Sequence, residues 1–209
     1  MSRGTTAGNN TETVDQLVDR YKKMVVAGRV VAPMAADNLD YWLSGKGGKK
    51  FIPATRFQNE SAVNSHLRDK HRKLFLSQSD PTKGIVPRLR RPPAAAHYQM
   101  TWEDSTYAKP FTDLFYGLGG FTVKSIVDVE VKKLNGNLWQ VVFKKWTAQV
   151  FDVYNWDDGK SAYVPGWGEI NDADANRVER AGKAKSYLIE STPWQVTDPT
   201  IIAPANVHA

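Results

Sequence analysis

The stretch that decides the fold is residues 121–160, which read FTVKSIVDVEVKKLNGNLWQVVFKKWTAQVFDVYNWDDGK. Apolar and polar residues alternate over 121–132, which is the pattern of a strand with one buried face. Asn135-Gly136 then gives the strongest short signal for a β-hairpin, and a second strand returns from Trp139. The pattern therefore predicts a pair of long antiparallel strands.

The returning strand changes its pattern part-way along. Its apolar residues keep one parity up to Phe143, and the parity reverses after Lys144. The apolar residues beyond this point are Trp146, Ala148 and Val150. Because side chains alternate along a strand, one extra residue moves the apolar set to the other face, which is what a β-bulge does. We therefore expect a bulge here, with Asp152 and Tyr154 on the face of Trp146 and Asn155 on the opposite face.

The remaining regular elements are expected to be mostly helical. Thr13 and Gln16 form a capping-box pattern at the start of an amphipathic helix that should end near Gly28. Helices are expected at residues 13–28, 34–43, 59–75 and 171–184, the last capped by Asn171 or Asp172, and a final strand at 187–189. The fold class predicted is α+β, with N-terminal helices, then a twisted antiparallel sheet, then a C-terminal helix and strand.

Composition limits the classes of function. The chain has 209 residues, which suffices for one substantial domain or a domain with a helical extension. It has no cysteine, which excludes disulfides, thiol catalysis and cysteine-based metal sites. The net charge of +6 favours an anionic partner such as a membrane surface or a phosphorylated substrate, although a solvated basic surface would look the same. No pattern of a nucleic-acid-binding module is present, so no nucleic acid is expected as partner.

Several catalytic motifs are missing. The four histidines include no H-E-x-x-H arrangement. His66 and His71 are five residues apart on an expected helix, which would place them on different faces, so their spacing argues against a catalytic zinc site. There is neither a nucleophile elbow nor a dinucleotide-binding fingerprint.

The end of the returning strand holds the polar groups that remain as candidates. They are Asp152, Tyr154, Asn155, Asp157, Asp158 and Lys160. Carboxylates so placed could hold Mg²⁺ and activate a water molecule for attack on a phosphate. A base with a neighbouring positive group could do the same without metal. The same residue types also suit a plain polar turn.

The order of short motifs resembles one known family. The chain has YWLSGKG at 41–47, then His97-Tyr98, then LFYGLGGF at 114–121, followed by the hairpin and an Asp-x-Tyr strand end. This order, together with the closing run 173–189, is similar to the catalytic domain of colicin M-type bacteriocins. The resemblance extends over roughly 34–191.

The resemblance implies an irregular α+β domain with a half-open, β-barrel-like sheet. It also implies an antibacterial toxin that hydrolyses the peptidoglycan precursor lipid II at the undecaprenyl–pyrophosphate linkage, with Mg²⁺ as cofactor. In the family's Asp-x-Tyr-Asp signature, Asp152 would be the leading aspartate and metal ligand, and Tyr154 the tyrosine. Asn155 stands where the family has its second aspartate, so Asp157 or Asp158 would have to assist.

Other expected roles depend on the same resemblance. In the family, a His-Arg pair or an arginine follows the Asp-x-Tyr-Asp signature. This chain has no His-Arg pair there, and Lys160 is the nearest cation. A basic loop at 77–93 would face the pyrophosphate or the anionic membrane. The expected substrate-binding residues are Trp156, Arg88, Arg90 and Arg91. The partners implied are lipid II or another anionic lipid-linked ligand, with a membrane surface and an immunity protein as further candidates.

Three functions stay open at this level: a lipid II hydrolase, a catalytically silent ligand-binding protein on the same fold, and a structural or assembly protein.

The N-terminal residues have no apolar core of a Sec signal peptide, and no segment is long and apolar enough to span a bilayer. The protein is expected to be made in the cytoplasm, to be released or delivered by a secretion machine, and to act in the target periplasm. The domain limits expected are 1–32 for a disordered tip with an amphipathic helix, 33–192 for the α+β domain and 193–209 for a Pro-rich tail.

Overall fold

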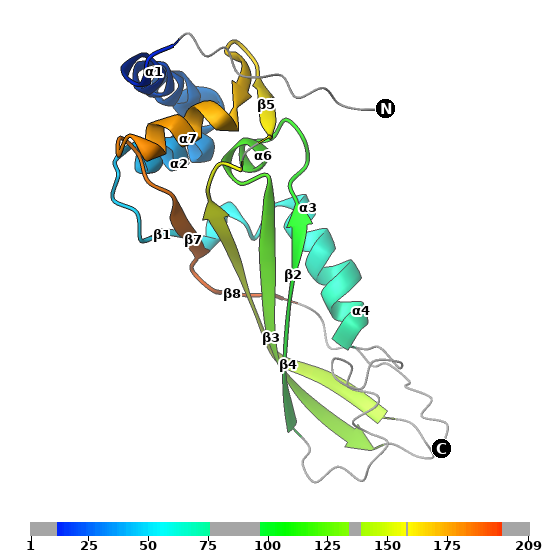
Figure 1. The fold of residues 1–209 in the computed structure, drawn as a ribbon. Coiled ribbons are helices and arrows are strands. Elements are labelled where there is room, and N and C mark those ends of the chain that lie inside the picture. Colours follow the sequence, from blue (N-terminus) through cyan, green and yellow to red (C-terminus); the bar gives the residue numbers. More distant parts are fainter. Residues whose placement is uncertain (1–11, 76–96, 134–138, 158, 198–209) are drawn as a thin grey trace. The chain divides into compact units, whose positions relative to one another are not determined.

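The computed structural model describes residues 12–75, 97–133, 139–157 and 159–197 (Figure 1). The expected hairpin turn at Asn135-Gly136 lies outside the described residues, as does Asp158. The three arginines expected to bind substrate, Arg88, Arg90 and Arg91, lie outside them too. Helices and a several-stranded open sheet make up the described part, so the predicted α+β class is confirmed.

The elements follow one another as α1 (Val14–Val31), α2 (Pro33–Leu43), β1 (Lys49–Ile52), η1 (Ala54–Arg56), α3 (Ser61–Ser65), η2 (His66–His71), α4 (Arg72–Phe75), β2 (His97–Tyr107), α6 (Asp113–Gly117), β3 (Gly120–Lys133), β4 (Trp139–Tyr154), β5 (Ser161–Val164), β6 (Gly168–Asn171), α7 (Asp172–Arg180), β7 (Tyr187–Ser191) and β8 (Trp194–Gln195). The larger sheet has the strand order β1-β7-β4-β3-β2, and β8 pairs with β4. Strands β5 and β6 form a separate two-stranded sheet.

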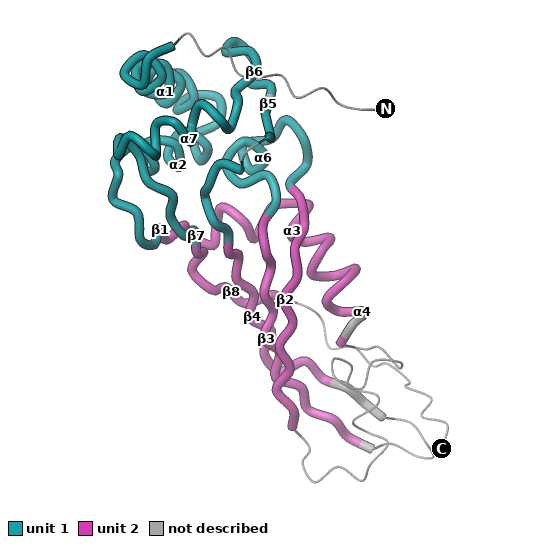
Figure 2. Tube along the Cα trace, in the orientation of Figure 1, with its two compact units in different colours: residues 1–50, 108–120, 152–189 teal, residues 51–107, 121–151, 190–209 magenta. Residues whose placement is uncertain are grey.

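The chain divides into two compact units, each assembled from three separate segments (Figure 2). Unit 1 comprises residues 1–50, 108–120 and 152–189, and unit 2 comprises 51–107, 121–151 and 190–209. The domain limits expected from the sequence stay a prediction.

Strands β3 and β4 pair antiparallel, as the alternating sequence predicts. The alternate residues of β3 from Phe121 to Val131 are all buried. Asp128 lies opposite Lys145 and Val129 lies opposite Phe143, so Lys144 is an extra residue on β4. The predicted bulge is therefore confirmed, and beyond it Trp146, Ala148 and Val150 are buried, as predicted.

Helix α1 begins as predicted and ends later than predicted. Thr13 and Gln16 form the expected capping box. Gly28 lies inside the helix. Glycine suits this position because a Cβ atom there would come within 3.1 Å of the Cβ of Ala36 on α2. Gly28 thus serves the close approach of two helices and does not end α1, which continues to Val31 just before Pro33.

The N-terminus of α2 is capped by a residue far away in the sequence. The two carboxylate oxygens of Asp113 accept hydrogen bonds from the N–H groups of Met34 and Ala35, each at 2.9 Å. The N-cap residue Ala32 has no side chain that could do so. This cap joins α2 to α6 within unit 1.

We expect Asp113→Ala to lower the free energy of unfolding by about 0.5–2 kcal/mol, which is the range for loss of a helix cap. Urea denaturation followed by circular dichroism measures this change. Asp19→Ala, which removes an exposed carboxylate from α1, is the matched control and should change stability by less than about 0.5 kcal/mol. Equal stabilities of the two variants would show that the cap contributes nothing.

The predicted third helix is present, but its central turn is wider than an α-helix. Residues His66–His71 form a π-helical turn between α3 and α4. The N–H of Arg72 donates to the carbonyl of Leu67, five residues earlier. Side chains five apart therefore come to the same face, which an α-helix does not allow.

Helix α7 ends before the predicted limit of Ala184. Gly182 has a positive φ of 70°, and its N–H donates to the carbonyl of Glu179. The N–H of Lys183 donates to the carbonyl of Val178. These bonds form a Schellman cap, which ends the helix at Arg180.

In the described part of the chain, no helix is long and apolar enough to cross a membrane.

Candidate functional site

The end of β4 lies in a cluster of large aromatic rings within unit 1. We call the following residues the aromatic cluster: Tyr21, Tyr41, Trp42, Tyr154, Trp156 and Tyr187. Tyr154 stacks on Tyr187 of β7 with ring centroids 5.1 Å apart. Its edge-on contact with Trp156 has a centroid distance of 5.9 Å, and Trp156 in turn lies 5.5 Å from Trp42 of α2. The expected catalytic tyrosine and the expected substrate-binding tryptophan are therefore in contact.

Hydrogen bonds fix two rings of the aromatic cluster. The hydroxyl of Tyr187 donates to the backbone carbonyl of Asn38 at 2.9 Å. The indole N–H of Trp42 donates to a carboxylate oxygen of Glu179 at 2.6 Å. The indole N–H of Trp156 is buried and has no hydrogen-bond partner among the described residues. An unpaired buried donor costs free energy, which a bound water or ligand would recover.

Asp152 is half-buried beside these rings. Burial raises the pKa of its carboxyl group to about 7, and a hydrogen bond from the backbone of Val153 opposes this rise only weakly. Burial also raises the pKa of Tyr154 above its usual value, so its hydroxyl stays protonated. Asp152 can therefore exchange a proton near neutral pH, as a general acid or base must.

The pKa of Asp152 predicts a pH dependence of stability. Because the folded carboxyl has a pKa of about 7 and an unfolded aspartate has one of about 4, the folded state binds more protons between these values. The free energy of unfolding should therefore fall as pH rises through this window. Asp152→Asn removes the ionisation. We expect urea midpoints to show the variant gaining stability relative to the wild type from about pH 4 to pH 7; a constant difference would contradict the raised pKa.

Three of the other expected catalytic residues, Asn155, Asp157 and Lys160, contact one another. The amide of Asn155 donates to a carboxylate oxygen of Asp157 at 3.1 Å, and Lys160 forms an ion pair with the other oxygen. The side chains of Asp157 and Lys160 are 50% and 70% exposed. Asp157 is thus already bound by two donors in an exposed turn. Its assistance to Asp152 stays a prediction.

The family resemblance implies Asp152 as the protein ligand of Mg²⁺. Asp152 belongs to no described group of three or more potential metal ligands. Mg²⁺ in proteins is often held by one or two carboxylates together with substrate phosphates. A metal-binding role for Asp152 therefore stays a prediction.

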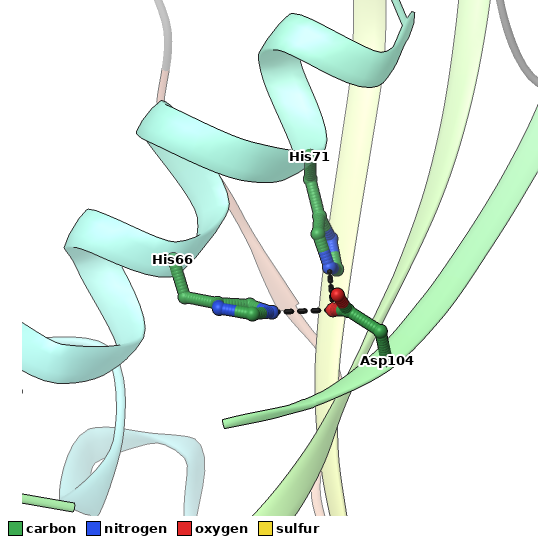
Figure 3. A group of neighbouring side chains, drawn as sticks. All are labelled: His66, His71 and Asp104. Atoms are coloured by element: carbon green, nitrogen blue, oxygen red, sulfur yellow. Dashed lines mark hydrogen bonds and ion pairs between the residues drawn. The ribbon is translucent and has the colours of Figure 1, made fainter. Parts of the chain in front are cut away.

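Unit 2 contains a cluster that the sequence analysis missed. His66 and His71 extend from η2 toward the carboxylate of Asp104 on β2 (Figure 3). Their ring centroids are 4.9 Å apart, so the prediction that they occupy different faces is wrong. The reason is the π-helical turn, which brings residues five apart to one face. No sequence pattern that we used distinguishes this turn from an α-helix.

Each member of this cluster has several partners. The Nε2 atoms of His66 and His71 both contact one oxygen of Asp104, the latter at 2.9 Å, and Lys70 forms an ion pair with the other oxygen. Burial alone would raise the pKa of Asp104, but hydrogen bonds from Lys70, His71 and His66 outweigh it and lower the pKa to about 2. Burial lowers the pKa of His71, against the influence of Asp104. Asp104 is therefore ionised and His71 favours its neutral form.

Comparison with known proteins gives one distant match. No protein-family model matches the chain, and no curated protein matches it. Among solved structures, the chain is similar to PaeM, a colicin M-like bacteriocin produced by Pseudomonas aeruginosa, with 14% sequence identity and a TM-score of 0.39. The match covers 78% of this chain and 50% of PaeM. The chain thus has a distant structural resemblance to a colicin M-like bacteriocin and spans about half its length.

Proposed function

We propose that the protein is an antibacterial toxin that hydrolyses lipid II at the undecaprenyl–pyrophosphate linkage, with Asp152 as its general base. The observation that carries the proposal is the half-buried carboxyl of Asp152, whose pKa burial raises to about 7. Such a group is rare outside sites where protons are exchanged. Its place directly before Tyr154 agrees with the Asp-x-Tyr order of the family that the sequence resembles.

The proposed reaction is hydrolysis of a phosphoester bond. Ionised Asp152 takes a proton from a water molecule, whose oxygen attacks the phosphorus atom next to the lipid chain. The bond from phosphorus to the undecaprenyl oxygen breaks, and the departing oxygen takes up a proton to give undecaprenol. The soluble product retains both phosphates. The protonated hydroxyl of Tyr154 is suited to donate a hydrogen bond to a phosphate oxygen.

The surroundings of Asp152 suit a ligand with an apolar and an anionic part. The half-buried rings of the aromatic cluster, Tyr41, Tyr154 and Trp156, offer apolar surface to a polyprenyl chain, and the unpartnered N–H of Trp156 offers a donor to an oxygen. Mg²⁺ would be the cofactor, held by oxygens of the pyrophosphate, which leaves the carboxyl of Asp152 free to act as the base. We further propose a membrane-associated site of action in the target periplasm, delivery by lysis or a secretion machine, and an immunity protein as partner.

A second candidate is a catalytically silent protein that binds a lipid-linked ligand. It is favoured by Asn155, which stands in place of the family's second aspartate and cannot act as a base. The remaining described acid of the turn, Asp157, already accepts a hydrogen bond from Asn155 and forms an ion pair with Lys160. This candidate predicts binding of lipid II without turnover.

The two candidates are separated by identifying the product. Purified protein is incubated with lipid II in detergent micelles, with Mg²⁺ in one series and a chelator in the other. We expect undecaprenol and a water-soluble pyrophosphate-linked disaccharide in the magnesium series. Release of undecaprenyl phosphate instead would place the cleavage at another bond. Retention of intact lipid II by folded protein would favour the silent binder, and neither binding nor product would contradict both.

A further inference from the structure

We propose that His66, His71 and Asp104 form a binding site for one divalent transition-metal ion of the zinc class. The site lies entirely within unit 2 and does not depend on the function proposed for Asp152. It is the one group of three or more potential metal-ligating side chains in the described part of the chain.

The positions of the ligand atoms are close to those that a metal requires. One ligand atom from each residue lies within 4.8 Å of the other two. Zinc–nitrogen bonds of 2.0–2.1 Å in a tetrahedral site imply ligand atoms about 3.3 Å apart. His71 Nε2 lies 2.9 Å from Asp104 Oδ1. His66 Nε2 lies closer still to the same oxygen, so both imidazoles would have to move away from Asp104 Oδ1 to admit the ion, with a fourth position left for water.

The second nitrogen of His71 is already oriented as in metal sites. Its Nδ1 lies 2.6 Å from the hydroxyl oxygen of Ser125, which also accepts a hydrogen bond from the indole N–H of Trp146 at 3.1 Å. In the metal-bound form the proton of His71 would sit on Nδ1, where Ser125 can accept it with its remaining lone pair, and the Nε2 that faces Asp104 would be free to bind the metal. Metal-binding histidines nearly always have such a second partner, which fixes their tautomer and orientation.

The charges of the cluster are compatible with a bound cation. Asp104 offers a carboxylate oxygen and the two histidines offer imidazole nitrogens, which bind metals in their neutral form. Lys70 also contacts Asp104, but its side chain is 51% exposed and can turn into solvent when a metal takes the carboxylate. Two imidazole nitrogens with one carboxylate suit zinc, cobalt or nickel better than magnesium or calcium, which prefer oxygen ligands.

The backbone supplies an independent argument. The π-helical turn at His66–His71 departs from the α-helical hydrogen bonding on either side of it, in α3 and α4. Single π-turns inside α-helices are rare and occur frequently at functional sites. Here the turn has a specific result, because it brings the two imidazoles to the same carboxylate.

The test is titration of the tag-free, full-length protein with Zn²⁺ by calorimetry. We expect one equivalent to bind to the wild type, and Asp104→Asn, which keeps the size and one acceptor oxygen, to weaken binding at least tenfold. His97→Ala is the matched control, because it removes an exposed histidine of the same strand, and its affinity should equal that of the wild type. Bound Co²⁺ should show the intense visible absorption of low coordination number.

Two results would overturn the proposal. The first is the absence of saturable Zn²⁺ binding to folded wild-type protein. The second is equal affinity of the wild type and Asp104→Asn, because the ion would then be bound elsewhere. If Asp104→Asn fails to fold by circular dichroism, His66→Asn takes its place in the same comparison, with the same expected loss.

Discussion

Asp152→Asn should lower the rate of lipid II cleavage by roughly 10²–10⁴-fold, the usual contribution of a general base. The amide has almost the same shape as the carboxyl group but cannot take a proton from water. Because burial already favours the neutral form of Asp152, with a pKa of about 7, the neutral amide should fit the same surroundings without loss of stability. The rate is measured as release of undecaprenol under single-turnover conditions.

The control for this experiment is Asp40→Asn, which removes an exposed carboxylate of α2 in the same unit. It makes the same chemical replacement away from Asp152 and should leave the rate unchanged. Wild-type cleavage by Asp152→Asn would remove Asp152 from the mechanism, whatever the behaviour of the control. Equal losses in both variants would instead indicate a general effect of charge on binding to the substrate micelle.

Trp146→Ala should lower the free energy of unfolding by about 3–5 kcal/mol, as expected for removal of a large buried ring. Trp146 is 2% exposed, and its ring lies 6.1 Å from that of Phe75 and 5.8 Å from that of Phe143. The substitution also leaves the hydroxyl of Ser125 without its indole donor. Urea denaturation monitored by circular dichroism measures the loss.

Two further variants separate the causes of this loss. Trp146→Phe keeps most of the ring and removes the N–H, so its loss should be nearer the 0.5–1.5 kcal/mol typical of one hydrogen bond. Tyr107→Ala removes a ring that is 79% exposed on β2 and should cost less than about 0.5 kcal/mol. A loss for Trp146→Ala as small as that for Tyr107→Ala would contradict the packing described for unit 2.

The central strands were predictable because their signal is local and strictly periodic. Alternation over β3 identified the buried face, and the reversal of parity between Phe143 and Trp146 predicted a bulge, which the structure places at Lys144. The same parity argument assigned Asp152 and Tyr154 to one face. The aromatic cluster was not predictable, since Tyr21, Trp42 and Tyr187 reach it from elements far apart in the sequence.

The histidine cluster was missed for a different reason. The expected helix was correct, but its hydrogen-bonding pattern was taken as α-helical throughout, and a π-turn has no recognised sequence signature in this segment. Asp104 is 38 residues from His66, on a strand that the sequence analysis did not assign individually. Cap residues that act at a distance, such as Asp113 for α2, escape local sequence patterns in the same way.

The pH dependence of kcat/KM tests most directly whether Asp152 with its raised pKa is the base in lipid II cleavage. We expect a rate that rises with pH through a single inflection near pH 7, because only ionised Asp152 can accept the proton from water. No cleavage at any pH, or a rate that stays flat between pH 5 and about pH 8, would contradict it.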